Sequence, residues 1–426
     1  PDVLNALLEG ENSGAAAGRN SCGAEQVGGA GFAAECAAYA REGLTYRTLG
    51  AEVAWALNLP LPRRYGFVLF FNPCSSSEAL HFFFRLCGLK VGIWGIGGWG
   101  TYERNYQNAL SGKAALATLC PISKLEPYRK HCYLMDGGFS LVLAVRDPIS
   151  SLKSYCNHIH NVFTAQNITA RMREFRAYDE EFIFPEIFYC TEKDPKDRRP
   201  SVDALAYLAQ DVESFYSLDE ILDICADSVR EVVVLDFHRD LAFGACFESF
   251  RALSQRLGFA PPEEGLGFAF EKKVNLYDGL NHLPVRLGFE GFELWVSVPY
   301  ITHDLRAWRN VTPELFGAEF VLENVFVLIE RGAAQDFLAH ENFKKMRGYV
   351  AAYIEALGRY VEGVRARLLG EGDVLEFLAS NPAAALKLRE AIERNFKRVK
   401  AERPDIVASW KYYAEFERIC AGFGGG

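Results

Sequence analysis

The fold is decided by one stretch of sequence, Phe70-Phe71-Asn72-Pro73-Cys74-Ser75-Ser76-Ser77-Glu78-Ala79-Leu80. It completes a continuous apolar run, residues 66–71, rich in Phe and typical of a buried strand of a parallel sheet. Asn72-Pro73 ends the strand, and the apolar residues at helical spacing that follow predict a helix over 75–87. The sequence therefore predicts a sharp strand-to-helix turn built from small hydroxylated residues.

Such a turn suits phosphate binding. It directs successive backbone N–H groups and the positive end of a helix dipole toward one point. The hydroxyls of Ser75, Ser76 and Ser77 can add further donors. The alternative is an ordinary serine-rich helix cap. The loop is not a Walker A motif, because G-x-x-x-x-G-K-[ST] is absent.

A second strand-to-helix segment carries an arginine. Residues 140–145 form another continuous apolar run, and Arg146-Asp147-Pro148 follows it, with the proline placed to start a helix reaching to about residue 162. Arg146 thus stands at the carboxyl end of a strand, where open α/β sheets bind ligands. Ser154 lies about two helical turns further on, so that both side chains can share one phosphate. The alternative is an arginine that pairs with Asp147 or caps a neighbouring helix.

The remaining pattern predicts an α/β fold, a parallel sheet covered by helices, with a C-terminal helical cap. Further strands are expected at 89–94 and 231–236, and helices at 102–110, over most of 202–229 and at 243–257. We divide the chain into a Gly/Ala-rich leader with short helices (1–60), the α/β core (61–265), an irregular β-containing insertion (266–341) and a helical C-terminal region (342–426). This last region is expected either to pack on the core or to form a homo-oligomer contact.

These segments together resemble the paired signature of the sulfotransferases: strand–Pro-x-Ser-Gly-Thr–helix, then strand–Arg-Asp/Asn-Pro–five residues–Ser. The resemblance implies a P-loop sulfotransferase-like fold and 3′-phosphoadenosine 5′-phosphosulfate (PAPS) as cofactor. It implies that Arg146 and Ser154 hold the 3′-phosphate. The loop would hold the 5′-phosphosulfate through the positions Pro73, Cys74, Ser75, Ser76, Ser77 and Glu78. A third match is Asp240-Leu241 after the 231–236 strand, although His238 and Arg239 depart from the family pattern there.

Two departures fall in the loop itself. Cys74 stands where the family usually has Lys or Arg, and Ser76 stands where it has Gly. The missing cation would stabilise charge during sulfuryl transfer, so another residue must supply it, with Lys124 and Lys411 as candidates. The whole chain also resembles an uncharacterised bacterial domain family of unknown function that is grouped with sulfotransferase-like P-loop proteins.

A hydroxyl acceptor needs a general base, and histidine is suited to that role near neutral pH. His131 is nearer to the place where the family keeps its base, and His158 resembles a histidine often found just after the family's serine. A packed or solvent-exposed histidine without a catalytic role is the alternative for each of them.

Gly95-Ile-Gly97-Gly98-Trp-Gly100 fits the dinucleotide fingerprint G-x-G-x-x-G. A dinucleotide site also needs an amphipathic helix and then an acidic residue at the end of the next strand, and neither is evident. A glycine-rich loop near the cofactor is the preferred interpretation, in which Trp94 or Trp99 could stack on adenine or a sugar.

The composition excludes several kinds of protein and site. The 426 residues carry a net charge of −9 without a long basic run, so no nucleic-acid partner is expected. The 11 cysteines form no C-x-x-C pair or metal-ligand spacing, so no metal site is expected, and reduced thiols favour a cytoplasmic protein. No signal peptide and no transmembrane segment of about 20 apolar residues is evident.

The first interpretation is a sulfotransferase that transfers a sulfuryl group from PAPS to a hydroxyl, with a glycan as the acceptor suggested by bacterial-family analogy. The second is a non-catalytic nucleotide- or glycan-binding protein on the same fold, which the Cys74 substitution motivates. The third is a dinucleotide-dependent oxidoreductase that uses the Gly95 loop.

Overall fold

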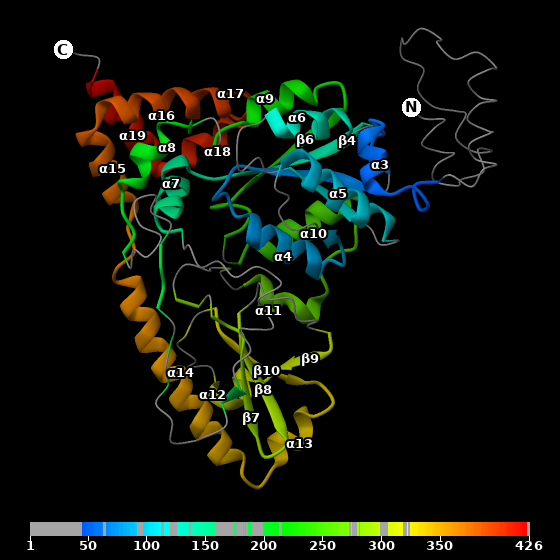
Figure 1. The fold of residues 1–426 in the computed structure, drawn as a ribbon. Helices are drawn as coiled ribbons and strands as arrows, with labels where there is room; N and C mark the ends of the chain where they lie inside the picture. Colours follow the sequence, from blue (N-terminus) through cyan, green and yellow to red (C-terminus); the bar gives the residue numbers. More distant parts are fainter. Residues whose placement is uncertain are drawn as a thin grey trace.

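The computed structural model describes residues 45–423 (Figure 1). Its description omits 63–64, 92–96, 112–114, 120–125, 136–137, 159–173, 176–181, 183, 185, 190–198, 213–214, 243, 272–273, 275–278, 281, 299–305, 318–321 and 323. Within these bounds the molecule is a mixed α/β structure with two sheets. A parallel sheet surrounded by helices forms the upper part of Figure 1, and an antiparallel sheet flanked by a long helix forms the lower part.

The parallel sheet contains five strands in the order β2-β3-β1-β4-β6. The strands are β1 (Tyr65–Phe71), β2 (Lys90–Val91), β3 (Ala115–Leu119), β4 (Phe139–Val145) and β6 (Val229–Asp236). Phe71 is paired with Ala144, and Val145 with Asp236, so the carboxyl ends of β1, β4 and β6 are level with one another. The three long runs predicted as strands are therefore confirmed as neighbours in one sheet.

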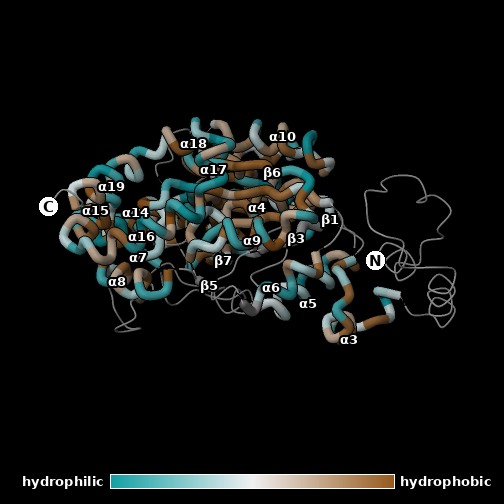
Figure 2. The backbone as a smooth tube through the Cα atoms, turned by 90° about the horizontal axis from the view of Figure 1, so that it is seen from above, coloured by the Kyte–Doolittle hydropathy of each residue, from teal (hydrophilic) through white to brown (hydrophobic). Residues whose placement is uncertain are grey.

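The central strands β1, β4 and β6 are mainly apolar because both faces of the sheet are covered. Val68 and Phe70 of β1 point into one core, whereas Leu69 and Phe71 point into the other. The second core is closed by α4 (Ser77–Leu86) and α10 (Cys246–Leu257). The first core is closed by α5 (Gly97–Leu110), α6 (Glu126–Tyr133), α7 (Pro148–Cys156), α8 (Ala204–Leu208), α9 (Leu218–Ile224) and the C-terminal helices, with α3 (Ala51–Ala56) beside α5. In Figure 2 the strands in the middle of the sheet are coloured mainly as hydrophobic.

Some element predictions were wrong. The sequence pattern missed β3, because Ala-Leu-Ala-Thr-Leu has no period that distinguishes a strand from a helix. The helix expected at 102–110 begins earlier, at Gly97, and the helix expected over most of 202–229 is two short helices, α8 and α9, joined by turns. The helix that starts at Pro148 ends at Cys156, before the predicted limit.

The antiparallel sheet has the order β5-β7-β8-β10-β9. Its strands are β5 (Glu174–Phe175), β7 (Val285–Phe289), β8 (Phe292–Ser297), β9 (Trp308–Asn310) and β10 (Phe326–Glu330), with the short helices η4 (Glu264–Leu266), α11 (Gly267–Phe270), α12 (Thr312–Phe316) and α13 (Ala334–Ala339) around them. Glu290 and Gly291 both have positive φ, 45° and 89°, as a two-residue hairpin turn between β7 and β8 requires. The insertion over 266–341 that was predicted to contain β structure thus holds β7, β8, β9 and β10.

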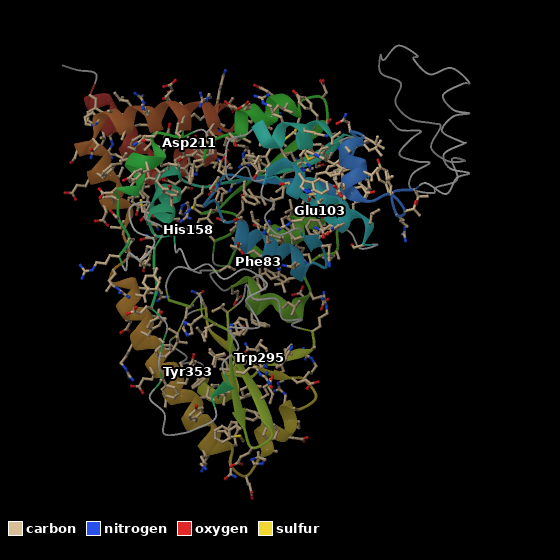
Figure 3. The ribbon with its side chains drawn as sticks, viewed as in Figure 1. Phe83, Glu103, His158, Asp211, Trp295 and Tyr353 are labelled. Carbon is tan, nitrogen blue, oxygen red and sulfur yellow. The ribbon has the colours of Figure 1, made fainter. Side chains whose placement is uncertain are left out.

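The long helix α14 (Phe343–Arg365) packs its apolar stripe on this second sheet, with Met346, Val350 and Tyr353 fully buried (Figure 3 labels Tyr353). The two sheets are linked through aromatic contacts, since the rings of Phe83 on α4 and Phe270 on α11 stack at 4.9 Å. The sequence grouped α14 with the C-terminal helices, whereas its packing places it with the insertion.

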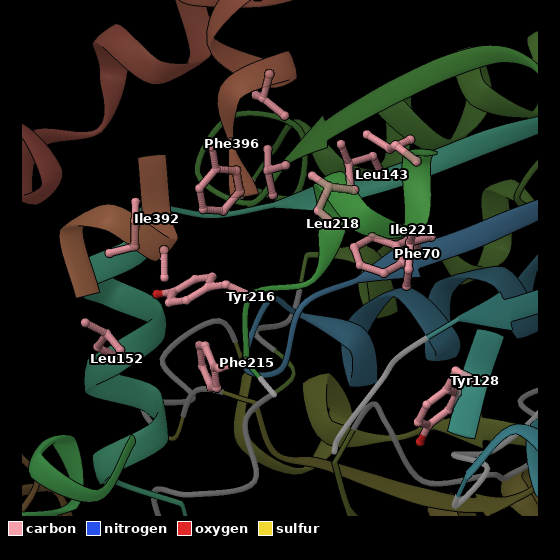
Figure 4. Packing of buried hydrophobic residues seen from close by; sticks show 14 of the residues in the cluster. Phe70, Tyr128, Leu143, Leu152, Phe215, Tyr216, Leu218, Ile221, Ile392 and Phe396 are labelled. Atoms are coloured by element: carbon pink, nitrogen blue, oxygen red, sulfur yellow. The ribbon is translucent and has the colours of Figure 1, made fainter. Parts of the chain in front are cut away.

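The C-terminal helices pack on the parallel sheet's side of the molecule (Figures 1 and 4). They are α15 (Glu371–Ser380), α16 (Pro382–Asn395), α17 (Lys397–Glu402), α18 (Pro404–Ser409) and α19 (Lys411–Gly422). Figure 4 shows Ile392 and Phe396 of this region close to Tyr216 and Leu218, in the same core as Phe70. The predicted C-terminal helical cap is confirmed. No helix in the described part of the chain is long and apolar enough to span a membrane.

Candidate functional site

The strand order changes direction at the carboxyl ends of β1 and β4. The chain leaves β1 toward β2 and β3 on one side, and leaves β4 toward β6 on the other side. Adjacent parallel strands whose connections diverge in this way form a topological switch point, which is where open α/β sheets bind ligands. Both segments singled out by sequence, the loop after Phe71 and Arg146 after Val145, begin at this point.

The loop after β1 has the backbone of an anion-binding turn. Cys74 and Ser76 have positive φ, 60° and 72°, and the right-handed helix α4 begins at Ser77. Alternating right- and left-handed residues turn successive N–H groups toward one point. The backbone of Ser76 has the left-handed conformation that glycine, which the sulfotransferase pattern has at this position, adopts without strain. Ser77 and Glu78 lie in the first turn of α4.

Arg146 crosses from β4 to this loop. Its Nη1 donates to the carbonyl oxygen of Cys74 at 3.2 Å and to Oγ of Ser154 at 2.9 Å, and its guanidinium lies 4.5 Å from the centre of the Phe237 ring. Burial lowers the pKa of Arg146, while Cys74 and nearby carboxylates act to raise it. The structure therefore brings together three residues that the sequence assigned to one cofactor site.

The loop and Arg146 also have unused hydrogen-bonding capacity. The side-chain amide of Asn72 is 2% exposed, and neither Nδ2 nor Oδ1 has a partner among the described residues. The same holds, within that part of the chain, for Oγ of Ser76 and Nε of Arg146. Buried polar groups are normally paired, so this group of donors and acceptors fits a polar, anionic ligand that bonds them.

Asp147 does not pair with Arg146. Its Oδ1 caps α7 by accepting from the Ile149 N–H at 2.9 Å, with Pro148 in the first turn. Its Oδ2 accepts from the backbone N–H of Tyr412 at 2.9 Å and of Tyr413 at 3.2 Å, at the start of α19. Burial raises the pKa of Asp147, which these bonds partly offset.

Asp236, at the end of β6, also accepts hydrogen bonds from its own turn and from the C-terminal region. Its Oδ1 accepts from the N–H groups of His238 and Arg239, both at 3.0 Å, and its Oδ2 accepts from the indole Nε1 of Trp410 at 2.9 Å. The segment from Trp410 to Tyr413 is thus held against the carboxyl edge of the sheet by two buried aspartates. Lys411, a candidate cation, lies in this segment and is exposed.

The two predicted histidines differ in burial. His131 is fully buried in α6, with its Nε2 3.3 Å from the side-chain nitrogen of Asn105, and burial lowers its pKa to about 3. An imidazole with so low a pKa is a weak base, and the role of His131 as general base stays a prediction. His158 follows the end of α7 (Figure 3) and is half-buried. Lys124 lies outside the described residues.

One histidine that sequence reasoning set aside lies at the site. His238 is exposed in the turn after β6, and its ring packs edge-on against Phe237 at 5.1 Å, the same ring that Arg146 contacts. Burial and the charge of Arg146 lower the pKa of His238 below its usual 6.5. The sequence signal was its position just beyond a buried strand next to β4.

The glycine fingerprint of the oxidoreductase interpretation lies only partly within the described residues, because Gly95 is outside them. Gly97 is the first residue of α5 and Gly100 lies in its first turn, and β3, the next long strand, ends in Leu119 rather than in the acidic residue that a dinucleotide site needs. Trp99 is in the same helix, and Trp94 lies outside the described residues. No cluster of His, Cys, Asp and Glu in the described ranges could hold a metal ion.

A family model described as a protein of unknown function, DUF2972, matches residues 239–423. This segment starts in the turn after β6 and extends through α19, so it includes Trp410 but neither the Asn72–Ser76 loop nor Arg146. No curated protein and no solved structure matches the chain.

Proposed function

We propose that the protein binds PAPS at the switch point between β1 and β4 and transfers its sulfuryl group to a hydroxyl of an acceptor, with a P-loop sulfotransferase-like fold. One observation carries the proposal. Arg146 links the left-handed loop at Cys74 to Ser154, and buried polar atoms of Asn72 and Ser76 at that loop have no partner among the described residues. This combination suits a ligand with two anionic groups near one another.

In the proposed complex the loop amides and Ser75–Ser77 hold the phosphosulfate end, and Arg146 with Ser154 holds the 3′-phosphate. When bound, PAPS supplies an activated sulfuryl group. Cys74 brings no charge to the loop, but the Arg146 guanidinium lies within hydrogen-bonding distance of the Cys74 carbonyl and carries positive charge to that place. Lys411, at the start of α19, is a second candidate cation among the described residues. It would stabilise the negative charge that develops on the departing phosphate oxygen.

We assign the proton acceptor to His238. The acceptor oxygen forms a bond to sulfur, the bond from sulfur to the phosphate oxygen breaks with its electron pair going to that oxygen, and the acceptor proton passes to the imidazole. A pKa below 6.5 keeps this imidazole neutral at pH 7, so it is free to accept a proton. A glycan hydroxyl remains the acceptor class that we propose.

Replacement of His238 by Ala is expected to lower kcat by roughly 10²- to 10⁴-fold while leaving affinity for the desulfated cofactor unchanged. In the wild type, kcat should rise with pH as His238 loses its proton, with a midpoint below 6.5. His158→Ala is the comparison, because His158 also follows the site helix. A full loss in that variant, with normal turnover in His238→Ala, would move the assignment to His158.

The proposal is tested by calorimetry and thermal shift with 3′-phosphoadenosine 5′-phosphate, the desulfated cofactor. We expect saturable stabilisation by this compound and much less by ATP or NADH, because they lack the 3′-phosphate. Radiolabelled PAPS with a panel of glycan acceptors then tests transfer. Absence of any binding would refute the proposal. Binding without transfer would favour the second candidate, a non-catalytic nucleotide- or glycan-binding protein, which the uncharged Cys74 favours.

A further inference from the structure

A carboxylate from the C-terminal region lies beside the proposed phosphate pair. Glu371 is the first residue of α15, and its Oε1 accepts from Nζ of Lys153 and from Oγ of Ser150, both at 2.9 Å. Both donors belong to α7, the helix that carries Ser154. The Glu371 side chain is 18% exposed, so the carboxylate is largely shielded from solvent.

Hydrogen bonds connect this carboxylate to Arg146. Ser150 and Ser154 are four residues apart on one face of α7. Oγ of Ser154 donates to the carbonyl oxygen of Ser150 at 3.0 Å and accepts from Arg146 at 2.9 Å. Glu371 is also among the charges that act to raise the pKa of Arg146. The carboxylate is therefore about one helical turn away from the guanidinium and hydroxyl that would hold a phosphate.

The carboxylate is ionised at neutral pH. Burial by itself would raise the pKa of Glu371, but the bonds from Lys153 and Ser150 outweigh it and bring the pKa below 4.5. An ionised carboxylate next to a phosphate repels it, although Lys153 reduces this cost. A carboxylate can only accept hydrogen bonds, so it favours a ligand that presents a donor beside its phosphate.

We propose that Glu371 is a specificity-determining residue of this site, whose carboxylate accepts a hydrogen bond from the hydroxyl adjacent to the phosphate held by Arg146 and Ser154. The inference rests on the proposed function: in a 3′-phosphoadenosine ligand this hydroxyl is the ribose 2′-OH. Both side-chain donors to the carboxylate go to Oε1, and Oε2 accepts from no side chain in the described part of the protein. Acidic residues select ribose hydroxyls in the same way in dinucleotide sites.

The test is a comparison of two ligands in matched variants. Calorimetry would measure the Kd of 3′-phosphoadenosine 5′-phosphate and of its 2′-deoxy analogue for the wild type. We expect about a tenfold preference for the ribonucleotide, the size of one hydrogen bond to a charged group. In Glu371→Ala the ratio of the two constants should fall close to one.

Two control variants separate recognition from structural effects. Lys153→Met breaks the same ion pair between α7 and α15 but keeps the carboxylate, so it should retain the preference. Glu376→Ala removes an exposed carboxylate from the same helix and should also retain it. A purely structural role of Glu371 would weaken both ligands equally and leave the ratio unchanged, which would overturn the inference.

The failures can be distinguished. Equal binding of the two ligands by the wild type would overturn the role of Glu371 and leave the proposed function intact. If neither ligand binds the wild type at up to millimolar concentration, the proposed function is wrong, and the inference fails with it.

Discussion

Replacement of Arg146 by Ala is expected to weaken binding of 3′-phosphoadenosine 5′-phosphate by about 100-fold, about 2.7 kcal/mol. The guanidinium is buried between the loop and α7, where it bonds Cys74 and Ser154, so its interaction with a phosphate would be little screened by water. Arg146→Lys should lose part of this affinity, because an ammonium keeps the charge but not the planar fork of donors.

The measurement is calorimetry at fixed ionic strength, with circular dichroism and the melting temperature of the unliganded variants as controls for folding. Arg347→Ala on α14 is the matched control, since Arg347 is an exposed arginine far along the chain from the loop. If Arg146→Ala folds and binds the compound as the wild type does, Arg146 is not part of the ligand site.

Replacement of Trp410 by Ala is expected to lower the free energy of unfolding by about 4 kcal/mol. Trp410 is 1% exposed, and its ring packs edge-on against Phe396 at 5.2 Å. Its indole N–H donates to the buried carboxylate of Asp236. Trp410→Phe keeps much of the packing but leaves that carboxylate oxygen without the indole donor, so a loss of about 2 kcal/mol is expected.

The loss in free energy of unfolding caused by Trp410→Phe should depend on pH. Burial holds the pKa of Asp236 above 3.8, and the indole bond opposes that rise. Loss of the indole raises the pKa further, so the folded variant binds the Asp236 proton more tightly than the folded wild type does. Its stability relative to the wild type should therefore improve as the pH falls from about 7 through the raised pKa toward about 4.

Urea unfolding of each variant at several pH values measures both effects. Leu386→Ala on α16, a partly exposed side chain, is the control and should change stability little. The role assigned to the contact with Asp236 would be contradicted if Trp410→Phe lost the same free energy of unfolding at both ends of this pH range.

Short stretches of sequence were sufficient to predict a strand or helix where the physical cause of that element is local. A strand covered on both faces is mainly apolar, so the apolar runs that became β1, β4 and β6 were recognisable without coordinates. Proline is favoured in the first turn of a helix, and Pro148 after Asp147 does start α7. The same local logic failed for β3, whose small, mixed residues fit either type of element.

The sequence by itself determined the α/β class, the strand-to-helix turns after Phe71 and Val145, and a C-terminal helical region, because apolar periodicity and turn residues act over a few positions. Only the tertiary structure decided which side chains meet at the switch point. Asp147 and Tyr412 are 265 residues apart, and Ser150 and Glu371 are 221 apart. Such contacts depend on how whole helices pack, and packing is set by the combined shape of many side chains, which no short stretch of sequence encodes.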